Sequence, residues 1–156
     1  MVKFNPYFWI TAIVIIILDQ MTKYLIATFQ PYWLMGFLSI HLVKNTGAGW
    51  GILQGQTLLL GIISLIVVVL VLWQYPSFSP QRWPQFLWGL FFGGVFGNMI
   101  DRLLRQYVID FLSVSFWPAF NVADAAISVA VIGLLILYWK EWDNYFEGEV
   151  SAKSYR

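Results

Sequence analysis

The sequence contains no cysteine and only one histidine, His41, among its 156 residues. Without cysteine there are no disulfides, thiol nucleophiles or thiolate metal sites, and a single histidine excludes a histidine-rich zinc site. Charged residues make up only 11% of the chain, and the formal net charge of +1 argues against a nucleic-acid interface. Carboxylates therefore remain as the main catalytic groups, and we expect no metal and no other cofactor.

Hydrophobic residues, in contrast, make up 60% of the chain, far more than in a soluble domain. Apolar segments that approach the ~20 residues needed to cross a bilayer occupy residues 7–27, 57–75, 83–104 and 122–142. Backbone polar groups in lipid must be satisfied within their own segment, which favours helices. The sequence predicts an all-α integral membrane protein, a single membrane domain over residues 1–156 with four transmembrane helices. The first segment is expected to stay as a span, because no small-residue cleavage site follows it.

The parts outside these spans are a surface loop (28–56) and a polar tail (143–156), which we expect to be frayed. In the loop, Leu38–Leu42 alternates apolar and polar residues, which predicts a small β-like surface element between the first two helices. Four spans place both termini on one side of the membrane. With the termini inside, five Lys and Arg residues lie on the cytoplasmic side and four on the outer side, which favours this orientation only weakly.

Carboxylates and asparagines concentrate between residues 93 and 128. Asn98 precedes Asp101 by three residues, and Asn121 precedes Asp124 by three, a spacing that predicts one shared helix face for each pair. With four spans, these two aspartates, Asp19 and Asp110 all fall on the same side of the membrane.

Two such carboxylates sharing one proton can hydrolyse a peptide bond. Like charges close together cannot both ionise easily, so one carboxylate can activate water while the other protonates the leaving nitrogen. The residues alone leave the choice of pair open. Asp101 has an alternative role as an ion pair with Arg102 at a helix end, and Asp19 has one as a salt bridge to Lys23.

Five motifs, in this order, resemble those of the lipoprotein signal peptidases (signal peptidase II). They read DQMTK at residues 19–23, NTGA at 45–48, GGVFGNMIDR at 93–102, VIDF at 108–111 and FNVAD at 120–124. Two departures lie outside the aspartates: Gly49 and Trp50 follow the second motif, and the connection from Asp110 to Asp124 is shorter than is usual in the family.

The resemblance implies a bacterial inner-membrane aspartic endopeptidase with both termini cytoplasmic and its active site near the periplasmic face. Its substrate would be a diacylglyceryl-modified prolipoprotein, cut before the lipidated cysteine. Membrane lipid would surround the enzyme. We expect a monomer. The family pattern assigns catalysis to Asp110 and Asp124. The positions that it assigns to support or substrate binding are Asp19, Lys23, Asn45, Asn98, Asp101, Arg102 and Asn121.

Two other functions would also use an apolar chain with interfacial carboxylates. A small proton-coupled transporter or channel subunit would use the carboxylates as relay groups, but relay groups belong near the middle of spans, and these lie near their ends. A purely structural membrane subunit would leave the two Asn-x-x-Asp repeats unexplained. For the loop, we expect Trp50 to take part in a clamp over the substrate.

Overall fold

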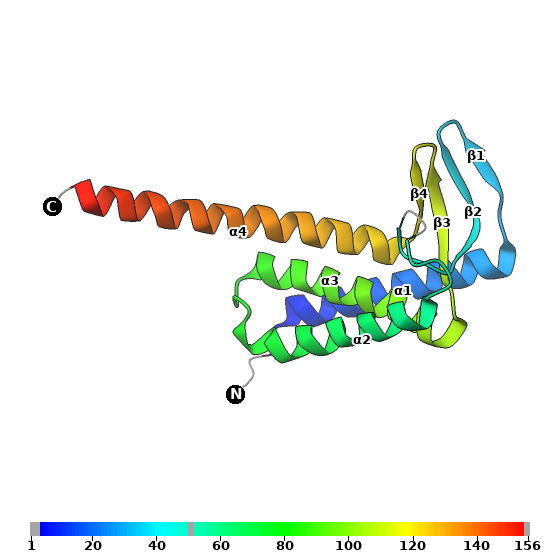
Figure 1. Ribbon diagram of the computed structural model, residues 1–156, viewed down its shortest axis with the longest axis horizontal. Helices are drawn as coiled ribbons and strands as arrows, with labels where there is room; N and C mark the ends of the chain where they lie inside the picture. The colour runs from blue at the N-terminus through cyan, green and yellow to red at the C-terminus, as the bar shows by residue number, and fades with distance from the viewer. Residues whose placement is uncertain (1–3, 50–51, 155–156) are drawn as a thin grey trace.

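Four long helices and a small antiparallel sheet make up the computed structural model, which describes residues 4–49 and 52–154 (Figure 1). Trp50, the residue singled out in the predicted clamp, lies outside these residues. The helices and helical turns are α1 (Pro6–Phe29), α2 (Thr57–Gln74), the 3-10 turn Tyr75–Ser77, α3 (Arg82–Ile100), the π-helical turn Asp101–Arg105 and α4 (Val122–Ser154). The strands are β1 (Trp33–Met35), β2 (Leu38–Asn45), β3 (Val108–Val114) and β4 (Trp117–Phe120).

Helix α3 is the innermost helix and packs against α1, α2 and α4. Its glycines make this close packing possible. A Cβ atom on Gly89 would lie 2.6 Å from the Phe8 carbonyl oxygen, and one on Gly93 would lie 2.8 Å from the Ala12 carbonyl oxygen. These glycines serve helix packing, since α1 could not approach α3 as closely if either residue had a side chain.

Three helical segments in the described part of the chain are long and apolar enough to cross a membrane: Pro6–Phe29, Thr57–Ser77 and Val122–Lys140. Their apolar side chains are largely exposed, as expected of helices that face lipid. Helix α3 is not among them. In α3, glycines at the helix contacts and the buried amides of Gln85 and Asn98 stand where the other helices have apolar side chains.

The sheet is larger than the sequence predicts. Its strand order is β1-β2-β3-β4. Strands β3 and β4, half of the sheet, come from the connection between α3 and α4. The prediction of an all-α fold with one β-like element, between the first two helices, is wrong on this point. The alternation that marks a half-buried strand is missing from β3, because Val108–Phe111 is buried on both faces. Strand β2 pairs with β3 antiparallel, with Leu38 opposite Val114 and Asn45 opposite Val108.

Helix α4 continues to Ser154, so the prediction of a frayed tail is wrong for residues 143–154. Once a helix is nucleated, each added residue costs little, and this tail contains no proline to stop it. The extension protrudes well beyond the other helices (Figure 1).

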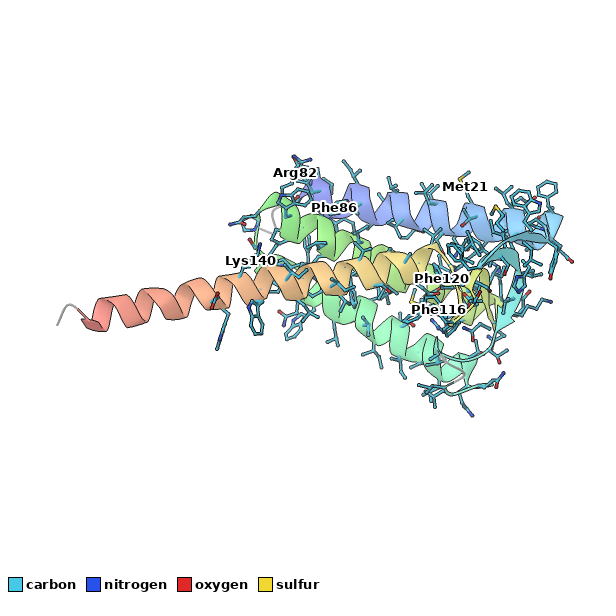
Figure 2. All side chains as sticks on the ribbon, turned by 90° about the horizontal axis from the view of Figure 1, so that it is seen from above. Met21, Arg82, Phe86, Phe116, Phe120 and Lys140 are labelled. Atoms are coloured by element: carbon cyan, nitrogen blue, oxygen red, sulfur yellow. The ribbon has the colours of Figure 1, made fainter. Side chains whose placement is uncertain are left out.

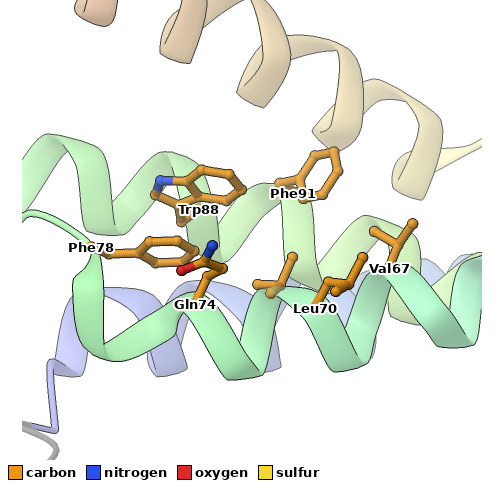
Figure 3. Close-up of a pocket in the computed structure, with 7 residues that line it drawn as sticks. Val67, Leu70, Gln74, Phe78, Trp88 and Phe91 are labelled. Atoms are coloured by element: carbon orange, nitrogen blue, oxygen red, sulfur yellow. The ribbon is translucent and has the colours of Figure 1, made fainter.

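An apolar pocket of about 350 Å³ lies between α2 and α3, close to the connection that joins them (Figure 3). It is lined by Val67, Leu70, Val71, Gln74, Phe78, Trp88 and Phe91. The pocket contains none of the predicted site residues, which gather at the opposite end of the bundle, beside the sheet.

Candidate active site

The predicted site residues lie together where the helix bundle meets the sheet. They come from α1, β2, the end of α3 with the π-helical turn that follows it, β3 and the start of α4. Hydrogen bonds, ion pairs or electrostatic interactions join all nine: Asp19, Lys23, Asn45, Asn98, Asp101, Arg102, Asp110, Asn121 and Asp124.

Asp110 is buried on β3 and receives two hydrogen bonds from neutral amides. Asn121 Nδ2 donates to Asp110 Oδ1 at 2.7 Å, and Asn45 Nδ2 donates to Asp110 Oδ2 at 2.9 Å. The Asn45 side chain is itself held, because its Oδ1 accepts a hydrogen bond from the backbone amide of Gly47. Burial first, and the nearby Asp124 carboxylate second, raise the pKa of Asp110 from its ordinary value to about 7, despite the two amide hydrogen bonds.

Asp124 lies in the first turn of α4, where it forms a reciprocal cap with Asn121. The backbone amide of Asp124 donates to Asn121 Oδ1 at 2.9 Å, and the backbone amide of Asn121 donates to Asp124 Oδ2 at 3.3 Å. This is a capping box, which satisfies two amides at the helix start. The prediction that both side chains share one helix face is therefore wrong here, because Asn121 precedes the helix.

Asn98 connects Asp124 to the charged residues of the site. Its Nδ2 donates to Asp124 Oδ1 at 2.8 Å, while its Oδ1 accepts from Lys23 Nζ at 2.9 Å and from Asn121 Nδ2 at 3.2 Å. With a cation on its oxygen, the Asn98 amide is held with its nitrogen towards Asp124.

Asp101, in the other Asn-x-x-Asp repeat, has different partners. It forms ion pairs with Lys23, at 3.0 Å, and with Arg105, and it accepts a hydrogen bond from the Ile109 backbone amide at 3.2 Å. The predicted pairing with Arg102 is wrong, because neighbouring residues on a helix point in different directions whereas residues four apart face each other.

Lys23 and Asp19 form the predicted salt bridge, at 2.8 Å, and both are fully buried. Asp19 also accepts a hydrogen bond from the Ala123 backbone amide at 3.0 Å, so it joins α1 to the start of α4. A carboxylate is well placed there, since the first amides of a helix have no partner within the helix.

Arg102 takes part in none of the ion pairs and hydrogen bonds described above. Its Nε is buried and has no hydrogen-bond partner among the described residues, although its guanidinium interacts electrostatically with Asp124 and Asp110. Such a donor is expensive to leave unpaired.

Two residues of the site were not predicted. Gln20 donates to Asp19 and to Asp101, and Arg105 donates to Gln20 Oε1 at 3.0 Å. The signal for Arg105 was present, because it follows Asp101 by four residues.

The site combines one carboxyl that can hold a proton near neutral pH with a second carboxylate next to it. Such a pair can act as acid and base on one water molecule. Among the side chains that the structure describes, no group of three or more histidine, aspartate or glutamate residues could hold a metal ion.

Comparison with known proteins finds the same family along almost the whole chain. The family described as signal peptidase (SPase) II matches residues 11–140. A lipoprotein signal peptidase of Microcystis aeruginosa is 39% identical over 146 residues, covering 87% of this chain and 94% of the relative. Those of Moorella thermoacetica and Staphylococcus aureus are 37% and 34% identical, covering 85% and 89% of this chain and 91% of each relative.

Two solved structures share the fold, both described as a bacterial membrane enzyme determined by the in meso method. One has a TM-score of 0.80, and the other a TM-score of 0.74. Each is 32% identical to this chain, and they cover 86% and 83% of it and 88% and 90% of their own chains. The family match and the relatives above 30% identity agree, and the chain belongs to the signal peptidase II family of membrane aspartic peptidases.

Proposed function

We propose that this chain cleaves the signal peptide from diacylglyceryl-modified prolipoproteins, on the N-terminal side of the lipidated cysteine, with Asp110 and Asp124 as the catalytic pair. The observation that carries the proposal is the contrast between the buried aspartates. Among the described residues, Asp110 receives direct hydrogen bonds only from neutral amides and can hold a proton near pH 7, while Asp101 is paired with two cations.

In this mechanism one proton is shared by the pair. Asp110 holds it at neutral pH and donates a hydrogen bond to the carbonyl oxygen of the scissile peptide. Asp124 accepts a proton from a water molecule, whose oxygen then attacks the carbonyl carbon. The carbon–nitrogen bond breaks as the leaving nitrogen receives the proton from Asp110, which produces a new carboxylate and a free amino group.

The remaining residues hold this pair in place. Asn121 bonds to both aspartates, Asn98 links Asp124 to Lys23, and Asn45 restrains Asp110 from β2. Arg102, with a buried and unpartnered Nε, is assigned to a carbonyl oxygen of the bound peptide. Asp19 and Asp101 compensate the buried charge of Lys23.

All four long helices cross the membrane in this proposal, α3 included. Although α3 is less apolar than the others, it faces α1, α2 and α4 rather than lipid, so its glycines and amides are not exposed to hydrocarbon. Both termini then lie in the cytoplasm, and the site lies near the periplasmic face of the bacterial inner membrane, where a diacylated cysteine would hold the scissile bond. The transporter alternative gains no support, because the pair lies at the end of the bundle.

The test uses purified protein in detergent with a diacylglyceryl-modified prolipoprotein as substrate. We expect Asp110→Asn and Asp124→Asn to abolish cleavage while each still gives a cooperative thermal melt. Asp143→Asn is the matched control, since this exposed aspartate lies far along α4. The unlipidated prolipoprotein should not be cut.

Asp101→Asn separates the two possible pairs. It removes a charge from the ion pairs with Lys23 and Arg105, so it should lower the melting temperature and leave measurable cleavage in the folded fraction. Cleavage by Asp110→Asn, together with a folded but inactive Asp101→Asn, would show that the pair is assigned wrongly. Failure of the wild type to cut the lipidated substrate would refute the proposed activity.

A further inference from the structure

The tips of the two hairpins carry a cluster of exposed apolar side chains. In the β1–β2 hairpin, Trp33 is 60% exposed and Phe37 73% exposed, and in the β3–β4 hairpin Phe116 is 78% exposed. The cluster, here called the hairpin-tip patch, consists of Tyr32, Trp33, Leu34, Met35, Phe37, Phe116 and Trp117. All three residues of β1 are exposed, so neither of its faces is covered by protein.

The two tips form one surface. Strands β2 and β3 pair up to Leu38 and Val114, next to the turns. Beyond them, the backbone amide of Ser115 donates to the Phe37 carbonyl oxygen at 3.1 Å, which ties one turn to the other. The patch is therefore continuous across both hairpins, and large continuous apolar patches mark interaction sites.

Charge is absent from the outer parts of both hairpins; Lys44 on β2 and Asp110 on β3 lie towards the helix bundle. No aspartate, glutamate, lysine or arginine occurs at residues 28–43 or 111–123. The edge strands β1 and β4 therefore lack the charges that normally protect a sheet edge in water from pairing with another chain. An uncharged, aromatic sheet edge is better suited to contact with lipid than to contact with water.

The direction of the sheet places the patch beside the bilayer. In Figure 1 the hairpins run at a steep angle to the helices, and both tips extend past α4. Figure 2 shows Phe116 at the sheet end of the molecule, with Lys140 far along α4. If the helices cross the membrane, the hairpins run along its surface and their tips lie over lipid outside the bundle.

The opposite end of the bundle offers a comparison. Trp73, Trp83 and Trp139 are exposed there, at the ends of α2, α3 and the apolar part of α4. Tryptophan and tyrosine concentrate at both interfaces of a membrane. Trp33, Trp117 and Tyr32 supply the second aromatic belt, and they do so from the sheet rather than from the helices.

We propose that the hairpin-tip patch inserts into the lipid of the leaflet nearest the active site and acts as a lateral membrane anchor for the sheet. The proposal rests on the membrane-spanning arrangement given under the proposed function. Strand β3 carries Asp110 and β2 ends at Asn45, so the anchor would fix the depth of these two residues relative to the membrane surface.

The absence of cysteine makes a direct test possible. Spin labels are attached to single-cysteine variants Phe116→Cys and Met35→Cys of the full chain in nanodiscs of phosphatidylethanolamine and phosphatidylglycerol. Collisions of each label with oxygen, which partitions into lipid, are compared with collisions with a water-soluble nickel complex. Leu70→Cys on the exposed face of α2 is the lipid reference, and Gln54→Cys, an exposed polar position in the loop, is the aqueous reference.

We expect both hairpin labels to give an oxygen-to-nickel ratio close to that at Leu70. A ratio equal to that at Gln54 would overturn the proposal, as would a lipid-like ratio that appears only after lipidated substrate is added. Strong spin–spin coupling between labels in discs holding two chains would assign the patch to a second copy instead. None of these readouts requires cleavage, so a failed anchor is distinguishable from a failed peptidase.

Discussion

The residues that surround each buried aspartate decide what that aspartate can do. Asp101 has cationic nitrogens of Lys23 and Arg105 on its carboxylate, whereas the direct partners of Asp110 in the described part of the chain are neutral amides. Burial of Asp110 is therefore not offset by a direct ion pair, and its pKa rises to about 7. Without the family resemblance, the sequence could not separate these two aspartates, because Lys23 reaches Asp101 from another helix.

The raised pKa of Asp110 predicts how stability changes with pH. The folded protein binds this proton more tightly than the unfolded chain, in which the carboxyl has its ordinary pKa near 3.8. The resulting contribution is fully present below about pH 4 and is lost as the pH rises towards 7. We therefore expect the melting temperature of Asp110→Asn minus that of the wild type to increase as the pH rises from about 4 to about 7.

Measuring the difference between the two proteins removes the titration of shared groups that do not interact with Asp110. The variant carries a constant penalty, because its new amide nitrogen faces the donors of Asn45 or Asn121. Only the slope against pH therefore tests the raised pKa. The kcat/KM of the wild type should also fall above about pH 7, as the shared proton is lost. A difference in melting temperature that does not vary with pH would contradict the prediction.

At the scale of elements, the apolar patterns predicted the four helices well and the second hairpin poorly. A helix facing lipid or other helices keeps a long apolar run, whereas the short strand β3 is buried on both faces and loses its alternation. The capping box at Asn121 and Asp124 could have been predicted, since its spacing directly precedes an apolar run. The two Asn-x-x-Asp repeats differ because only one of them stands at a helix start.

Contact between α1 and α3 gives a prediction at this scale. A Cβ atom on Gly97 would lie 2.6 Å from Asp19 Oδ2, and Asp19 is held in place by Lys23 and by the Ala123 backbone amide. Gly97→Ala should therefore force α1 and α3 apart and destabilise the protein by about 1–3 kcal/mol. We expect a lower melting temperature and reduced cleavage.

Gly49→Ala is the matched control for this substitution. No atom of the described residues lies within 4 Å of the Cβ position at Gly49, so the same added methyl group should leave the melt unchanged. Equal melting temperatures for Gly97→Ala and wild type would show that Asp19 can move, and that its hydrogen bonds do not hold α1 against α4.

At the scale of the whole molecule, simple topology predicted where the site would form. Alternating spans bring Asp19, Asp101, Asp110 and Asp124 to one end of the bundle, and all four meet there. The joining of two hairpins into one sheet could not be predicted in this way. It depends on pairing between β2 and β3, which lie far apart in the chain and carry no sequence signal for each other.

Helix α3 provides the last prediction, because its path decides the topology of the whole chain. If it crosses the membrane, Gln54 and Gln106 lie on one side and Gln81 on the other; all three residues are exposed. Single-cysteine variants at these positions would be treated with a membrane-impermeant maleimide in right-side-out and in inverted membrane vesicles. We expect Gln54→Cys and Gln106→Cys to label only in right-side-out vesicles, and Gln81→Cys only in inverted ones. Identical labelling of Gln81→Cys and Gln106→Cys would mean that α3 does not cross, which would place Asp110 and Asp124 at the cytoplasmic face, where the substrate bond proposed here would not reach them.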